Sequence, residues 1–185
     1  SELEKVAEDI RRLLKRNEEI NREMIKRSRE LNEELRERNR EVTERIRRLL
    51  ERLKEERKRT TDGETVERRI REVARRAREL LKRSEEMNKE VARRSKKLLD
   101  DSKKINDDSR RRLKRLLDEL RKRRRTDELE KKLRDLEREI RKVLREAKRL
   151  NDELRKENKE SLERLKREND KLRKEVETVI REAEK

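Results

Sequence analysis

Two short interruptions divide the 185-residue sequence into three helical segments of nearly equal length. The first, at about residues 59–63, holds the only Gly of the chain, and the second lies at about residues 124–126. Gly readily accepts the backbone conformations of a chain reversal, and no Pro occurs anywhere. The sequence therefore predicts helices at about 2–58, 64–123 and 127–184, each roughly 85 Å long at 1.5 Å per residue.

The residues that follow each interruption are typical of helix starts. Thr61 or Asp62 can cap the second helix, with an acidic residue, Glu64, in its first turn. Thr126 is a candidate cap of the third helix, and two acidic residues follow it. Acidic side chains at these places suit the positive end of the helix dipole, so we expect both helices to begin here.

The composition favours long helices over disorder. Charged residues make up 61% of the chain and hydrophobic residues only 26%, a balance that disordered chains also show. The remaining residues, however, are mostly good helix formers, and the apolar ones recur at helical spacing. Because Cys and His are absent, the chain has no thiol nucleophile and none of the usual transition-metal ligands, and it has no aromatic residue either. We therefore expect no enzyme activity, no cofactor and no metal.

Each segment carries one apolar stripe and no second one. In the first segment the stripe takes fourteen steps from Leu3 to Leu53, an average of about 3.57 residues. This lies between a heptad repeat and a straight helix and predicts a weak left-handed supercoil. Short loops make neighbouring helices antiparallel. The sequence thus predicts an all-α, up-down-up three-helix bundle forming a single domain over residues 1–185. We expect a monomer, with a homo-oligomer as the alternative.

Small polar residues interrupt the stripes at positions that correspond between helices. Facing residues of antiparallel helices share a constant sum of residue numbers, and those of parallel helices share a constant difference. Asn39 and Ser84 sum to 123, Ser84 and Asn169 sum to 253, and Asn39 and Asn169 differ by 130. The same three relations group the other polar residues into layers eleven residues apart, about 16.5 Å along a helix. The predicted layers contain, in turn, Asn17, Asn21, Ser102, Asn106 and Asn151; Ser28, Asn32, Ser95 and Asn158; and Asn39, Thr43, Ser84, Asn88 and Asn169.

Buried hydrogen-bond networks are the favoured interpretation of these layers. A buried amide without a partner costs a few kcal/mol, whereas a hydrogen-bonded one costs little. Such networks specify the register of helices, because a slipped bundle would bury amides against leucine. A ligand or ion site lined by the layers is a less favoured alternative, since no charged or aromatic residue joins them.

On these features the chain resembles de novo designed helical bundles with built-in hydrogen-bond networks. The resemblance rests on Asn, Ser and Thr layers in register, long uninterrupted helices, a one-Gly loop and the Thr-Asp-Glu helix start at Thr126. It implies a soluble, very stable scaffold with no native activity and no required partner. Membrane-bending domains built from three long basic helices are less similar, because those normally have kinks and aromatic residues.

The net charge of +17 is concentrated in the second predicted helix. Residues 66–123 hold 23 basic and 12 acidic residues, including Arg110-Arg111-Arg112 and most of the run at 121–125. An alternative function is therefore weak, salt-sensitive binding of polyanions, either nucleic acid or an anionic membrane. A surface charged for solubility is the favoured explanation. We expect no transmembrane segment and no targeting signal, so localisation stays open.

Overall fold

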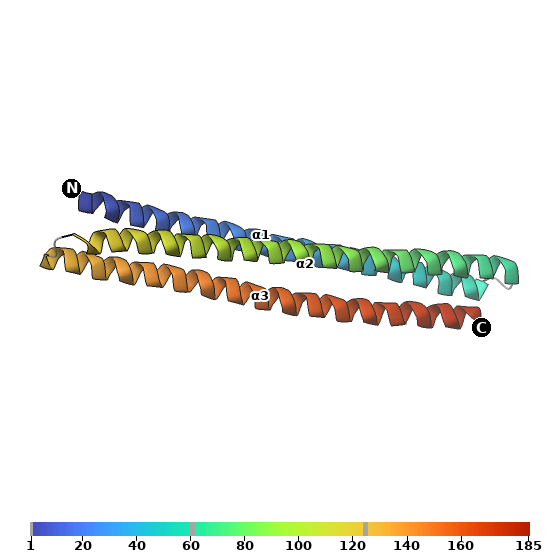
Figure 1. The fold of residues 1–185 in the computed structure, drawn as a ribbon. Coiled ribbons are helices and arrows are strands. Elements are labelled where there is room, and N and C mark those ends of the chain that lie inside the picture. The colour runs from blue at the N-terminus through green and yellow to red at the C-terminus, as the bar shows by residue number, and fades with distance from the viewer. Residues whose placement is uncertain (1, 60–61, 124–125) are drawn as a thin grey trace. The chain divides into compact units, whose positions relative to one another are not determined.

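The computed structural model describes residues 2–59, 62–123 and 126–185, and within these ranges it contains three helices and no strand. The helices are α1 (Glu2–Arg59), α2 (Gly63–Arg121) and α3 (Asp127–Glu184) (Figure 1). The predicted all-α fold of three long helices is confirmed. Residues 60–61 and 124–125, which belong to the two predicted loops, lie outside the described residues.

The start of α2 differs from the prediction at Gly63. This residue, which was predicted in the loop, is the first residue of α2, and its φ is not positive. Asp62 acts as the cap: its carboxylate accepts hydrogen bonds from the Glu64 backbone N–H at 3.3 Å and the Thr65 hydroxyl at 2.7 Å. The other candidate cap, Thr61, lies outside the described residues. The conformational freedom of glycine is therefore not used at Gly63.

The start of α3 follows the predicted pattern. The Thr126 hydroxyl accepts a hydrogen bond from the backbone N–H of Leu129 at 3.2 Å, and its carbonyl accepts one from Glu130 at 3.0 Å. Three acidic residues lie in the first turn of α3, where they favour the positive helix end. The helix before it, α2, ends at Arg121, two residues before the predicted end.

The chain divides into two compact units, and all three helices contribute to each. The first unit combines Ser1–Arg29 with Ser95–Glu157, and the second combines Glu30–Arg94 with Asn158–Lys185. The prediction of a single domain and that of a left-handed supercoil stay predictions.

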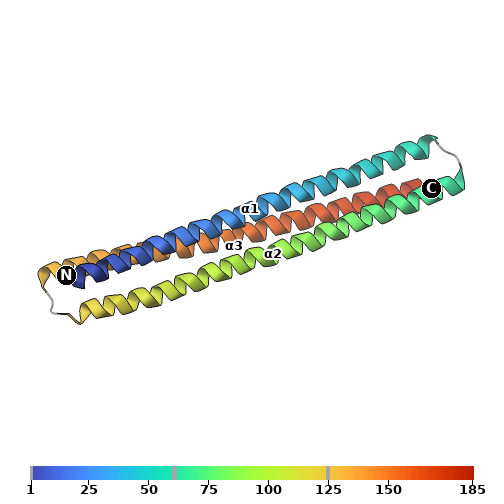
Figure 2. The same cartoon turned by 90° about the horizontal axis from the view of Figure 1, so that it is seen from above.

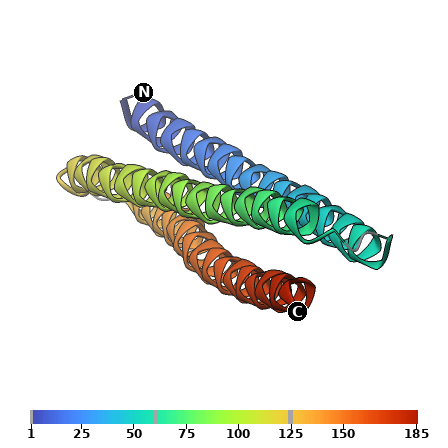
Figure 3. The same cartoon turned by 90° about the vertical axis from the view of Figure 1, so that its right-hand side faces the viewer.

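The helix directions within the second unit follow from its contacts. Along α1 and α2 the contacts run in opposite order, since Asn39 bonds Ser84 while the later Glu56 pairs with the earlier Arg69. Along α1 and α3 the contacts run in the same order, since Asn32 bonds Asn158 while the later Arg57 bonds the later Ala183. The α2 ribbon accordingly runs opposite to α1 and α3 (Figure 2 and Figure 3).

Each unit has its own apolar core. In the first unit Ile10, Leu113 and Leu120 are completely buried among leucines of α3. In the second unit Ile46 and Val176 are completely buried, together with residues of α2. At roughly 25 cal/mol per Å² of buried apolar surface, these cores supply most of the driving force for folding.

We predict that Leu113→Ala and Leu53→Ala each lower the free energy of unfolding by about 2–5 kcal/mol, because each leaves a cavity in a different core. Guanidinium denaturation followed by circular dichroism measures both. If the chain is one domain, each substitution shifts one shared transition. Two transitions, each moved by only one of the substitutions, would contradict the single-domain prediction.

We also predict that Gly63→Ala raises the free energy of unfolding by about 0.4–1 kcal/mol, because Ala restricts the unfolded chain more than Gly does. An added Cβ at this position would meet nothing within 4 Å, so the folded state accommodates it. Thermal denaturation of the two proteins side by side measures the change. A lower melting temperature for the Ala variant would show that the backbone at this position needs glycine.

Candidate functional site

The residues of the predicted polar layers lie in the protein interior. Twelve of the fourteen are buried, and the other two, Asn32 and Thr43, are half-buried. Across the part of the chain that the structure describes, every buried polar side chain belongs to this predicted set. Burial makes the hydrogen-bond partners of each residue decisive for its energetic effect.

In the second unit, Asn39 of α1 is the centre of a hydrogen-bonded cluster. Its Nδ2 donates to the Leu35 carbonyl and to Asn88 Oδ1, both at 2.7 Å. Its Oδ1 accepts from the Ser84 hydroxyl at 2.8 Å and from Asn88 Nδ2 at 3.2 Å. An amide group offers two donors and two acceptor positions, so Asn39 is fully hydrogen-bonded although it is only 5% exposed. We call Asn39, Ser84 and Asn88 the Asn39 cluster.

In the first unit, Asn21 of α1 occupies the corresponding place. Its Nδ2 donates to Asn17 Oδ1 at 3.0 Å and to Asn106 Oδ1 at 2.8 Å, and its Oδ1 accepts from the Ser102 hydroxyl at 2.7 Å. We call these four residues the Asn21 cluster. The Asn17 Nδ2 is buried without a partner, so this cluster is less completely hydrogen-bonded than the Asn39 cluster.

Both clusters use the same pattern. An asparagine of α1 binds a serine of α2 and the asparagine that follows that serine by one turn. The predicted sum of 123 describes the pair Asn39 and Ser84, which are bonded. It also describes Asn17 and Asn106, but both of these bind Asn21 rather than each other. A central residue that reaches two partners on α2 was not apparent from the sums alone.

Among the described hydrogen bonds, none joins Asn151 or Asn169 of α3 to these amide clusters. Asn151 Nδ2 donates to the Leu99 carbonyl at 2.8 Å, and its Oδ1 accepts from Arg155 Nε at 2.7 Å. Asn169 is buried but makes no hydrogen bond with the described residues. Thr43 bonds the carbonyl of Asn39 in its own helix, at 2.9 Å, as hydroxyls in helices commonly do. The clusters therefore connect α1 mainly to α2.

The four residues of the predicted middle layer belong to different units. Asn32 Nδ2 donates to Asn158 Oδ1, and both residues belong to the second unit. Ser28 and Ser95 belong to the first unit, where both are buried. The Ser95 hydroxyl has no hydrogen-bond partner. That these four residues form one layer stays a prediction.

The chemistry available to the two clusters is that of neutral amides and hydroxyls. These groups donate and accept hydrogen bonds but do not exchange protons near neutral pH. Within the described ranges no group of three or more acidic, His or Cys side chains is placed to hold a metal ion. The clusters are therefore suited to fixing how helices pair.

The perturbed ionisable groups lie on the surface, in ion pairs. Arg78 donates two hydrogen bonds to Glu177, at 2.9 and 3.0 Å, and this contact lowers the pKa of the Glu177 carboxyl. Arg149 lowers the pKa of Glu146 in the same way. A general acid needs a raised carboxyl pKa, so these shifts have the opposite sign from that of a catalytic acid.

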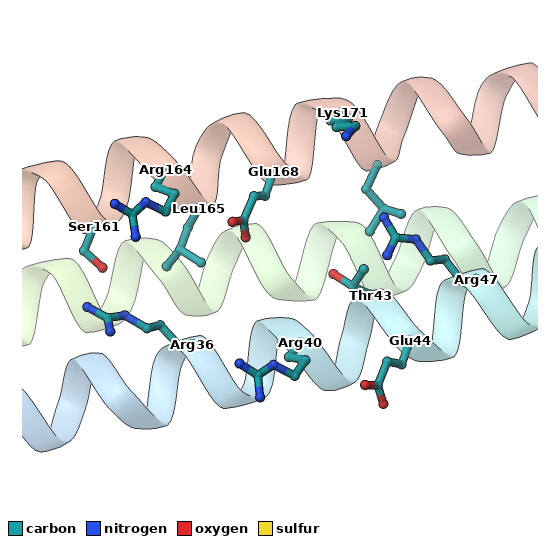
Figure 4. Close-up of a pocket in the computed structure, with 11 residues that line it drawn as sticks. Arg36, Arg40, Thr43, Glu44, Arg47, Ser161, Arg164, Leu165, Glu168 and Lys171 are labelled. Carbon is teal, nitrogen blue, oxygen red and sulfur yellow. The ribbon is translucent and has the colours of Figure 1, made fainter.

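A groove of about 470 Å³ lies between α1 and α3 in the second unit (Figure 4). Arg36 and Arg40 extend from α1 in this view, and Arg164 and Leu165 extend from α3. Part of its positive charge is offset, because Arg40 pairs with Glu37 at 3.7 Å. This mixed lining shows no single ligand chemistry.

We predict that three serine-to-alanine substitutions on α2 differ in their effect on the free energy of unfolding. Ser84→Ala and Ser102→Ala each remove a buried hydrogen bond and should lower the free energy of unfolding by about 0.5–1.5 kcal/mol. Ser95→Ala removes a buried hydroxyl without a partner and should leave stability unchanged or raise it. Guanidinium denaturation compares the three variants. An equal loss for Ser95→Ala would contradict the hydrogen-bond account.

Comparisons with known proteins agree with this fold. No protein-family model matches the chain, and no curated protein matches its sequence. Among solved structures, a "Computationally designed three helix bundle" is similar, with a TM-score of 0.74 and 20% sequence identity. The match covers 98% of this chain and 90% of that chain. At this identity the similarity shows the fold alone, a three-helix bundle, and none of the described helices has the length and apolar character to cross a bilayer.

Proposed function

We propose that this chain is a structural scaffold of the designed helical-bundle type, without catalytic activity, in which buried asparagine and serine residues specify helix pairing. The observation that carries the proposal is the complete hydrogen bonding of Asn39 inside an apolar interior. The similarity to a designed three-helix bundle supports it.

The Asn39 cluster discriminates between alternative pairings of α1 and α2 in the second unit. In the observed pairing Asn39 meets Ser84 and Asn88. A shift of α2 by one turn would place Leu80 where Ser84 now lies. The Asn39 amide would then be buried against an apolar side chain, at a cost of about 1–3 kcal/mol per unsatisfied group. The cluster therefore acts against the shifted pairing more than it adds to the stability of the observed one.

The polar clusters can determine which helix pairing forms without adding to the stability of the folded chain. Well-packed apolar side chains can replace a buried polar network with little loss, or even with a gain, in stability. A single buried asparagine in a coiled coil can nevertheless fix register and the number of helices. In this proposal the apolar cores keep the chain folded and the polar clusters select its pairing.

The proposed scaffold acts as a monomer. No large hydrophobic side chain among the described residues is exposed, so the described surface lacks the apolar patch on which a stable interface usually depends. Sedimentation at two protein concentrations tests this: a sedimentation coefficient that rises with concentration would contradict it.

We predict that Asn39→Leu lowers the free energy of unfolding by about 1–3 kcal/mol, because it leaves the Ser84 hydroxyl and the Asn88 amide without their partner. Replacing Asn39, Ser84 and Asn88 together by Leu, Ala and Leu should instead keep or raise stability. Guanidinium denaturation measures both. Asn169→Leu is the matched control, because Asn169 is buried in the same unit without a described hydrogen bond, and it should not destabilise the chain.

The register itself is measured with spin labels on cysteines placed at the exposed positions Arg36 of α1 and Lys89 of α2. The distance distribution between the labels should broaden, or gain a second peak, when the whole Asn39 cluster is made apolar. An unchanged distribution together with a harmless Asn39→Leu substitution would show that the cluster does not specify pairing.

A further inference from the structure

A second groove of the second unit, between α1 and α2, carries arginine on both sides. It has a volume of about 300 Å³, and Leu49 and Leu80, both half-buried, form its apolar part. Its lining includes Arg45 and Arg52 of α1, and Arg76 and Arg83 of α2. We call the groove that these four residues line the arginine groove.

These four arginines differ from Arg48 of the same groove, which pairs with Glu44 at 3.6 Å. On the same unit Arg78 pairs with Glu177 and Arg69 with Glu56 across helix borders. In contrast, none of the four makes an ion pair with any residue that the structure describes. The one acidic residue of the groove, Glu79, is paired with Arg75 at 3.5 Å.

Like charges thus line both sides of a border at which helical bundles usually place opposite charges. On each helix the two arginines are seven residues apart, which is about 10.5 Å along a helix. The positive charge of the four guanidinium groups therefore extends along the groove. A compact anion can meet only part of it, whereas an extended anion can meet more of it.

We propose that the arginine groove binds a linear polyphosphate anion. The planar guanidinium group donates paired hydrogen bonds that match phosphate oxygens, so arginine rather than lysine is the residue suited to this contact. The chain has no aromatic residue on which a base could stack. Recognition therefore rests on phosphate groups in series, and the site lies on α1 and α2 together rather than on the basic runs near the end of α2. This binding site is independent of the scaffold proposal.

The first unit offers a matched comparison. Its groove between α1 and α2 also holds four arginines, Arg16 and Arg112 among them, but Asp9 and Glu119 line it as well. Arg12 of this groove also pairs with Glu8 at 3.8 Å. Substituting two arginines changes the net charge equally in either groove, but two acidic residues line this groove whereas only Glu79 lines the arginine groove.

The test is isothermal titration calorimetry of the full chain with sodium tripolyphosphate at low ionic strength. The paired substitution Arg52→Gln and Arg76→Gln should weaken binding about tenfold or more, because it removes charge-assisted hydrogen bonds from both helices. The control pair Arg16→Gln and Arg112→Gln should weaken it less than about threefold, the effect of net charge alone. Equal weakening by the two pairs, or no binding by the unmodified chain, would overturn the proposal.

A charge-preserving pair separates phosphate recognition from simple attraction. Arg52→Lys with Arg76→Lys keeps both charges but removes the planar donor pairs, so it should still bind more weakly than the unmodified chain. Undiminished binding by the lysine pair would overturn the claim that guanidinium geometry matters. Circular dichroism confirms that each variant stays helical, as expected for exposed positions. Duplex DNA should lose affinity equally with both glutamine pairs; if tripolyphosphate behaves in the same way, the groove is not a specific site.

Discussion

The cost of burying an amide without a partner constrains how α1 and α2 pair within each unit. Asn39 and Asn21 lie in interiors that are otherwise mostly apolar, where an unpaired amide group costs about 1–3 kcal/mol. Asn39 escapes this cost through four hydrogen bonds, two of them to one asparagine of α2. Because these bonds need specific residues at specific positions, we propose that they restrict the pairing of α1 and α2 more narrowly than apolar packing alone does.

The third helix is held by different interactions. Two of its asparagines make no described bond to the amide clusters: Asn151 bonds a backbone carbonyl of α2, and Asn169 has no described hydrogen bond. In the second unit α3 is instead fixed by buried Val176 and by Arg78, which pairs with Glu177 on the surface. Exposed ion pairs contribute about 0–1 kcal/mol, so apolar packing dominates the placement of α3. The polar clusters and the apolar cores thus have different structural roles within each unit.

The sequence predicted the helices and the burial of the polar residues, but not the bonds that each residue makes. Apolar periodicity depends only on helix geometry, so it located α1, α2 and α3 to within two residues at the ends that were compared. An asparagine, however, can reach a side-chain amide or a backbone carbonyl from the same position. Asn151 takes the Leu99 carbonyl, and Thr43 bonds within its own helix. Such choices depend on side-chain rotamers and local helix separation, which residue numbers do not encode.

The surface arginines of the second unit also fall into two groups, those that pair with a carboxylate and those that do not. In the second unit Arg69 and Arg78 each meet a carboxylate of another helix, whereas Arg45, Arg52, Arg76 and Arg83 make no ion pair with the described residues. Exposed like charges are screened by water and salt, so this arrangement costs little in a chain with buried apolar cores. A stable bundle can therefore keep an uncompensated arginine groove at almost no loss of stability. In the binding that we propose, an extended anion gains contacts along the groove while the helices keep their positions.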